Sequence, residues 1–222
     1  MARVIVSYDG TRNDRDALAL GRLFAKAGAQ VSLAYVRHAA EPDSRREQEA
    51  QAQAEHLLAV GADEFDGSHV GQYVIVNRST AEGLAELATE LGAEVIAFGS
   101  SYRSPPGHVE VPHTAEQLLD LGVSCSLALA PAGLRREPVE QSIGTVALYD
   151  EHDDEAAQAT AKSLAHALGA VLTSEEADLL VIASRADTPV GHLRVGADER
   201  EQIERAVGPV LALVRGAELT FG

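Results

Sequence analysis

Residues 94–119, EVIAFGSSYRSPPGHVEVPHTAEQLL, join an apolar run, a glycine turn, a polar loop and a helical pattern. The apolar residues 95–98 predict a buried strand that breaks at residues 99–101, and helical periodicity resumes at Thr114. A strand, a glycine turn and a helix N-terminus in this order can hold an anion, because unpaired amides and the positive end of the helix dipole converge there. The stretch therefore predicts an α/β fold with a loop suited to a phosphate-bearing ligand.

The composition predicts a globular protein that avoids nucleic acid and membrane surfaces. The chain has 222 residues, of which 45% are hydrophobic and 23% charged, so it is long enough for one large or two small domains. Its formal net charge of −16 repels phosphate backbones and anionic lipid. We therefore expect neither nucleic acid nor a membrane as a partner.

The single cysteine, Cys125, lies in the apolar run SCSLALA. One cysteine excludes an internal disulfide, and its apolar surroundings favour a buried, inert thiol over a nucleophile. No apolar stretch reaches the length of a membrane span, and the N-terminal MARVIVSYDG enters a strand without room for a signal peptide. These features predict a cytoplasmic protein.

Strands and helices alternate along the first half. Apolar, β-branched runs predict strands at residues 3–8, 30–36, 72–76, 94–98 and 124–130. Such alternation calls for a parallel sheet that helices cover on both faces. Ligands bind these sheets at the carboxyl ends of strands where the strand order reverses, so we expect Asp9-Gly10 and Gly99-Ser100 to meet at one crevice.

Capping side chains predict where the helices begin. Asn13 or Asp14 is expected to cap the first helix. The pattern of Ser or Thr followed three residues later by Glu or Gln predicts capping boxes for three more helices. These boxes are Ser44 with Glu47, Ser79 with Glu82, and Thr114 with Gln117.

The second half is a shortened copy of the first. Residues 145–150, TVALYD, match the first strand, and an offset of 84 places Ala183 on Gly99 and Gly191-His192 on Gly107-His108. The run PVLAL matches SLALA within one residue of that offset. The interval from the strand-end aspartate to the glycine position is 90 residues in the first half and 33 in the second, a difference of 57 that corresponds to a helix, a strand and a helix. We expect domains at residues 1–133 and 144–222, joined by a connector at 134–143.

With this pattern the chain resembles a tandem universal stress protein with a shortened second domain. The resemblance implies the adenine nucleotide alpha-hydrolase-like fold, a doubly wound five-stranded parallel sheet, followed by a truncated repeat of the same fold. It also implies a nucleotide loop after strand four: a glycine, two spacers, a glycine, nine spacers, then Gly-Ser or Gly-Thr. An aspartate ends strand one, and strand two offers backbone groups to the adenine.

Carried over by position, the resemblance implies a damaged site in the first half. Gly99 matches the first loop glycine, but Tyr102 stands at the second, and Pro112-His113 replaces the final pair. Asp9 matches the strand-end acid. The candidate nucleotide- or ligand-binding residues are Asp9, Gly10, Val36, Gly99, Ser100, Tyr102, Arg103, His113 and Thr114.

The resemblance leaves only remnants of the site in the second half. Ala183 and Ala186 replace the first two glycines. The missing middle is expected to remove or displace the strand that contacts adenine. The remnants of the site are Asp150, Gly196 and Ala197.

The substitutions weaken phosphate binding. Pro112 has no amide hydrogen, and losing a hydrogen bond to a charged group costs about 1.5–3 kcal/mol. Glu110 adds negative charge, whereas Arg103, His108 and His113 can supply cations. We therefore expect ATP or AMP to bind weakly if at all.

Four candidate residues each have two interpretations. Asp9 can face a ribose or a metal, or can cap the turn into the first helix. His113 can contact phosphate or be a surface residue of a drifted loop. Thr114 fits a helix cap better than a phosphate ligand. Tyr102 can stack on a base or cover apolar surface.

Catalysis has little support in the sequence. The histidines show no metal-ligand spacing, and neither a Walker motif nor a nucleophile elbow occurs. The acidic run 150–154 is typical of a helix cap. We assign no catalytic and no metal residues and expect no enzyme, weak ATP hydrolysis being the remaining enzymatic alternative.

Two functions follow as hypotheses. The first is a stress-response module that binds an adenine nucleotide or a related small ligand in the first half. The second is a scaffold for protein partners. In resembling proteins the last strand pairs antiparallel with its counterpart across a dimer axis, so SLALA and PVLAL are predicted to pair within the chain as a pseudo-dimer. The pattern also allows a homodimer.

Overall fold

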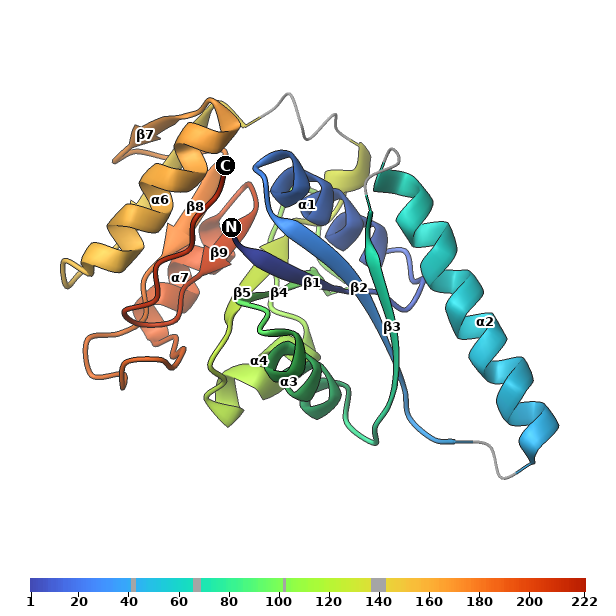
Figure 1. The fold of residues 1–222 in the computed structure, drawn as a ribbon. Helices are drawn as coiled ribbons and strands as arrows, with labels where there is room; N and C mark the ends of the chain where they lie inside the picture. Colours follow the sequence, from blue (N-terminus) through green and yellow to red (C-terminus); the bar gives the residue numbers. More distant parts are fainter. Residues whose placement is uncertain (41–42, 66–68, 102, 137–142) are drawn as a thin grey trace.

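The structure, a computed structural model, describes residues 1–40, 43–65, 69–101, 103–136 and 143–222. Its strands form one nine-stranded sheet in the order β3-β2-β1-β4-β5-β9-β8-β6-β7 (Figure 1). The first half contributes β1 (Arg3–Ser7), β2 (Gln30–Arg37), β3 (Gly71–Val76), β4 (Val95–Gly99) and β5 (Ser126–Ala130). The second half contributes β6 (Thr145–Tyr149), β7 (Val171–Thr173), β8 (Leu179–Ile182) and β9 (Val210–Ala212).

Helices connect these strands. The first half contains α1 (Asp14–Lys26), α2 (Ser44–Ala62), α3 (Thr80–Leu91), α4 (His113–Leu121) and the short 3-10 turns η1 (Asp63–Phe65) and η2 (Leu134–Arg136). The second half contains α6 (Glu155–Leu168) and α7 (Ala197–Arg205). No helix within the described ranges is both long and apolar enough to cross a membrane.

The strands within each half are parallel, and the halves meet through β5 and β9. These two strands pair antiparallel, with Leu127 opposite Ala212 and Leu129 opposite Val210. The prediction that SLALA and PVLAL pair within the chain is therefore confirmed. Both strands are fully buried, so each half covers the last strand of the other.

Helices cover both faces of the sheet. One core contains Leu18 of α1, Leu58 of α2 and Leu164 of α6, which pack on the same face. The second core contains Leu84 of α3, Leu118 of α4 and Ile203 of α7. Apolar side chains on both sides of β4 and β5 explain why these strands are apolar along their whole length. The predicted doubly wound α/β fold is confirmed.

The second half lacks counterparts of α2, β3 and α3, as the 57-residue deficit predicts. The expectation that the deficit removes or displaces the adenine-contacting strand is wrong. β7 pairs in parallel with β6, Thr145 opposite Val171, as β2 pairs with β1. The strand keeps its place but is shortened to three residues, against eight in β2.

The C-terminal segment joins the two halves on the face of α1 and α6. The amide of Ala2 donates to the carbonyl of Thr220 at 2.7 Å. The rings of Phe24 and Phe221 stack with centroids 5.8 Å apart. Because Phe221 is also bonded to Ser163 of α6, the segment holds α6 beside α1.

Two of the predicted helix caps are wrong. Asp43, rather than Ser44, caps α2 by accepting hydrogen bonds from two amides, and Glu47 instead binds Arg37. Pro112 occupies the N-cap position of α4, so Thr114 lies inside the helix. The Ser79 cap is confirmed, because its hydroxyl accepts from the amide of Glu82.

Candidate functional site

The carboxyl ends of β1 and β4 border a cavity of about 730 Å³, here called the crevice. β1 lies between β2 and β4, so the crevice stands where the strand order reverses. The structure brings the ends of both strands together there, as the sequence predicts. The predicted binding residues that line it are Asp9, Val36, Gly99, Ser100, His113 and Thr114.

Two described first-half candidates, Gly10 and Arg103, do not line the crevice. Gly10 lines a neighbouring hollow. Arg103 is exposed and is not among the residues that line the crevice. Tyr102 lies outside the described residues, so its stacking role stays a prediction.

Asp9 and Asp14 form a carboxylate pair at the mouth of the crevice. The amide of Asp9 donates to Asp14 Oδ2, and Asp9 Oδ1 accepts from the amide of Thr11 at 2.8 Å, which closes the turn into α1. Burial and the neighbouring Asp9 raise the pKa of Asp14 to about 8. Burial also raises the pKa of Asp9, but hydrogen bonds with Asp14 and Thr11 outweigh it and hold that pKa below its ordinary value. At neutral pH the pair therefore carries one proton.

Gly99 is needed because the loop after β1 touches the end of β4. A Cβ built on Gly99 would lie 2.1 Å from the carbonyl oxygen of Asn13. Asn13 Nδ2 also donates to the carbonyl of Ser100 at 2.8 Å. This glycine therefore serves close packing of two backbone segments.

The hydroxyl of Ser100 closes the loop on itself. It donates to the carbonyl of Ala130 at 2.7 Å and accepts from the amide of Glu110 at 3.1 Å. Ser100 is 3% exposed. Both of these bonds are internal, so the side chain stabilises the loop and offers little to a ligand.

The second half repeats this arrangement. Ser184 Oγ donates to the carbonyl of Leu213 at 2.8 Å and accepts from the amide of Arg194 at 3.2 Å. Gly107 and Gly191 both adopt positive φ, of 83° and 85°. The loop geometry therefore persists in a half whose sequence has lost the first two loop glycines.

The second-half remnants bond mainly to their own loop and helix. Asp150 accepts from the amides of His152 and Asp154 at 3.0 and 2.7 Å, which confirms the acidic run as a turn and cap. The amide of Gly196 donates to Glu199 Oε2 at 2.8 Å. Ala197 begins α7.

The N-terminus of α4 faces the crevice with an exposed histidine. His113 is the first helical residue, and its side chain is 83% exposed. Its Nδ1 lies 4.0 Å from Glu116 Oε2. With Pro112 before it, this end of the helix lacks one amide donor.

Val36 presents backbone groups at the opposite side of the crevice. The carbonyl of Ala34 accepts from Tyr8, whereas that of Arg37 accepts from Asn77 beyond β3. Backbone groups alternate along a strand, so those of Val36 face the side where β1 has already ended at Ser7. Its position suits contact with a flat heterocycle.

Sequence reasoning placed Asp9 at the site but missed residues 11–14, which follow it. Thr11, Arg12 and Asn13 line the crevice together with Asp14. The sequence indicated only a helix-capping role for Asn13 and Asp14. Their contacts with Ser100 and Asp9 form only when the loop is folded. The predicted strand order could have indicated their role, because β1 lies next to β4 and the residues that follow β1 therefore lie beside the end of β4.

The described residues contain neither a cluster suited to a metal ion nor a reactive cysteine. No group of three or more His, Cys, Asp or Glu side chains among them could hold a metal ion. Cys125 is buried, and burial raises the pKa of its thiol to about 12. At neutral pH the thiolate is not populated.

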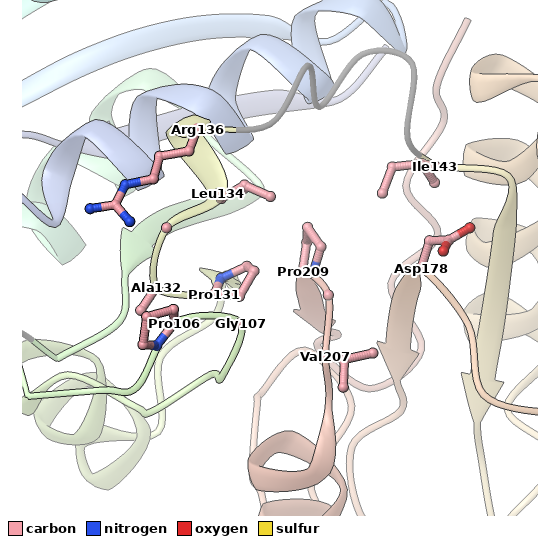
Figure 2. Close-up of a pocket in the computed structure, with 12 residues that line it drawn as sticks. Pro106, Gly107, Pro131, Ala132, Leu134, Arg136, Ile143, Asp178, Val207 and Pro209 are labelled. Atoms are coloured by element: carbon pink, nitrogen blue, oxygen red, sulfur yellow. The ribbon is translucent and has the colours of Figure 1, made fainter.

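A second cavity, of about 310 Å³, lies between the two halves (Figure 2). Its lining is mainly apolar, with Arg136 and Asp178 as the charged residues. Figure 2 shows the side chain of Arg136 pointing away from Asp178. Asp178 Oδ2 accepts from the amides of Gly144 and Thr145 at 2.9 Å each. The cavity therefore offers few groups to a polar ligand.

The sequence profile of the Universal stress protein family matches residues 1–131. The chain belongs to the universal stress protein family. Its crevice occupies the place at which the resemblance implies the nucleotide site. No curated protein sequence matches the chain significantly.

Solved structures share the fold of this universal stress protein over nearly its whole length. One is a universal stress protein from Archaeoglobus fulgidus DSM 4304, with 15% identity, a TM-score of 0.71 and coverage of 96% of this chain and 98% of that chain. Another is a functionally unknown protein from Pseudomonas aeruginosa PAO1, with 14% identity, a TM-score of 0.66 and coverage of 97% and 93%. At such identities the likeness concerns the fold alone.

Proposed function

We propose that the first half of this universal stress protein is a weak binding module for an adenine nucleotide, such as ATP or AMP, or for a related small ligand. The observation that carries the proposal is the crevice at the strand-order reversal, which gathers Asp9, Val36, Gly99 and His113 around one cavity. A cavity of about 730 Å³ is within the range of small-molecule sites.

The two ends of the crevice differ in what they offer. At the β2 end, Val36 presents backbone groups beyond the end of β1. At the α4 end, Pro112 lacks an amide hydrogen and the hydroxyl of Ser100 is used inside the loop. A lost bond to a charged phosphate costs about 1.5–3 kcal/mol, or about ten-fold to a hundred-fold in affinity. The crevice is therefore proposed to bind the base at its β2 end and to bind phosphate only weakly at its α4 end.

The proposed module binds its ligand without converting it. The described lining of the crevice contains no cysteine and no lysine that could act as a nucleophile. We propose a cytoplasmic stress-response role, in keeping with the family.

Thermal-shift titrations with AMP, ADP and ATP, with and without magnesium, test this proposal. A ligand selective for the folded state must raise the melting temperature. His113→Ala should weaken binding a few-fold, whereas His108→Ala, which removes an exposed loop histidine outside the crevice, should not. No shift at millimolar nucleotide contradicts the proposal.

A scaffold role is the second candidate, and the β5–β9 pairing favours it. Because β9 occupies the edge of β5, the shortened half acts as a built-in partner for the first. An absence of nucleotide binding, together with an associated protein that co-purifies with the intact chain and depends on the second half, would support the scaffold.

A further inference from the structure

Four arginines surround a hollow of about 440 Å³ beside the crevice, here called the arginine hollow. Its lining consists of Gly10, Arg12, Arg15, Arg135 and Arg136. No acidic side chain of the described residues belongs to this lining. The whole chain has 18 Lys and Arg residues and a net charge of −16, so four cations around one hollow stand out against an acidic surface.

A buried aspartate builds the arginine hollow. Asp16 of α1 is 1% exposed and accepts from the amides of Gly133 and Arg135 at 2.9 and 2.8 Å. It also pairs with the guanidinium of Arg135 at 2.7 Å. These bonds fix η2 against α1, and Leu134 between them is buried. The backbone therefore holds Arg135 and Arg136 beside Arg12 of the β1–α1 loop and Arg15 of α1.

The remaining arginines have no acidic partner within the described residues. Arg12, Arg15 and Arg136 are exposed and form no ion pair there. The side chain of Arg136 points away from Asp178, the other charged residue of the cavity between the halves (Figure 2).

A second group of arginines provides the contrast. Arg185, Arg194 and Arg200 also line a hollow, but Asp120 and Asp187 line it with them. Arg185 and Asp187 form an ion pair at 3.0 Å. The arginines of this second hollow therefore share it with carboxylates. No described carboxylate lines the arginine hollow, where Arg135 alone has an acidic partner, Asp16.

Like charges held close together repel, and an anion between them relieves that repulsion. Guanidinium groups match phosphate oxygens in geometry and can bind them through paired hydrogen bonds. We propose that the arginine hollow binds a multiply charged phosphoryl anion, a diphosphate or triphosphate group. This site uses the β1–α1 loop, the first turn of α1 and η2, and it is separate from the loop between β4 and α4.

Arg12 connects the arginine hollow with the crevice, because it lines both. The anion can therefore be the tail of a nucleotide whose base lies in the crevice, or a free polyphosphate. The site does not depend on the proposed nucleotide binding, because a free polyphosphate needs no base-binding pocket.

Calorimetric titration of the full chain with tripolyphosphate tests the site directly. The test variant is Arg15→Gln with Arg136→Gln, which removes two charges from the hollow and leaves every described residue of the crevice intact. The control is Arg200→Gln with Arg205→Gln, which removes two charges from α7. The wild type and the control should bind tripolyphosphate, and the test variant should bind it at least about ten-fold more weakly. Binding should also weaken as salt concentration rises.

Two outcomes overturn the proposal: no binding of tripolyphosphate by the wild type at millimolar concentration, or equal affinities in the test and control variants while both remain folded. Titrations with ATP and adenosine identify the source of the anion. A nucleotide tail is indicated if the test variant loses ATP affinity but keeps adenosine affinity. A free polyphosphate is indicated if ATP affinity is unchanged while tripolyphosphate affinity falls.

Discussion

The loops that contain Ser100 and Ser184 share the hydrogen bonds of these serines but differ in their surroundings. In each, a buried serine joins the loop to the end of the last strand, through Ser100 and Ala130 or Ser184 and Leu213. Around the first loop stand β2 at full length and the crevice. Around the second, β7 has three residues. Loop shape is therefore maintained by internal bonds, whereas a binding site needs the elements around the loop.

The largest expected effect concerns the segment that follows the last strand of each half. Asp16 binds this segment in the first half, and Asp154 binds it in the second. Asp16→Ala removes the partner of a guanidinium that is only 19% exposed and frees two amides, so we expect a loss of about 3–5 kcal/mol in the free energy of unfolding. Asp154 anchors the corresponding Gly216 and caps α6, and Asp154→Ala should cost about 1–2 kcal/mol. Denaturant unfolding measures both. Equal losses would contradict the described asymmetry.

The first residue of each loop, Gly99 or Ala183, gives a second comparison of the stability of the two halves. Gly99→Ala places a Cβ 2.1 Å from the carbonyl oxygen of Asn13, which the backbone must move to accommodate, so we expect about 2–3 kcal/mol of destabilisation. The second loop already has a side chain at Ala183, and Ala183→Gly should cost at most about 1 kcal/mol. Thermal unfolding of the two variants checks this. A neutral Gly99→Ala would show that the β1 loop does not hold Gly99 in place.

The two serines should be equivalent. Ser100→Ala and Ser184→Ala each remove a buried hydroxyl and leave a carbonyl and an amide without their side-chain partner, at a cost of about 1–3 kcal/mol each. Urea denaturation compares them. A large effect at one position alone would break the proposed equivalence of the loops.

The acidic pair gives the first half a pH dependence. The pKa of Asp14 rises from 3.8 to about 8 on folding, so the proton is held in the folded state and lost from the unfolded chain between these values. The free energy of unfolding should therefore decrease as pH rises through this window, by at most about 1.4 kcal/mol per pH unit. Asp14→Asn keeps a neutral side chain and should flatten that slope. Parallel pH profiles for the wild type and the variant would contradict this assignment.

The sequence predicted the fold well because duplication and strand alternation are local patterns. The fixed offset of 84 residues aligned the loops, and the matching runs SLALA and PVLAL predicted the β5–β9 pairing. The short strand β7 was misjudged, since three residues in an acidic stretch give almost no alternation to detect.

The candidate site was predicted less completely because its contacts join distant segments. Asn13 reaches Ser100 across 87 residues, and Asp16 reaches Arg135 across 119. Neither spacing has a sequence signature. Ser100 was expected as a ligand contact, yet its hydroxyl bonds within the loop, a role that the conserved offset to Ser184 could have suggested.

The most direct test of the central claim, that the nucleotide-binding crevice lies in the first half and not at the loop of residues 183–196, is an amide chemical-shift map of the full chain titrated with AMP. We predict shifts at residues 9–14, at the end of β2 and at the start of α4, with saturation only at high ligand concentration. Residues 183–197 should stay unchanged. Shifts of equal size in both loops, or none at the crevice at millimolar AMP, would contradict the claim.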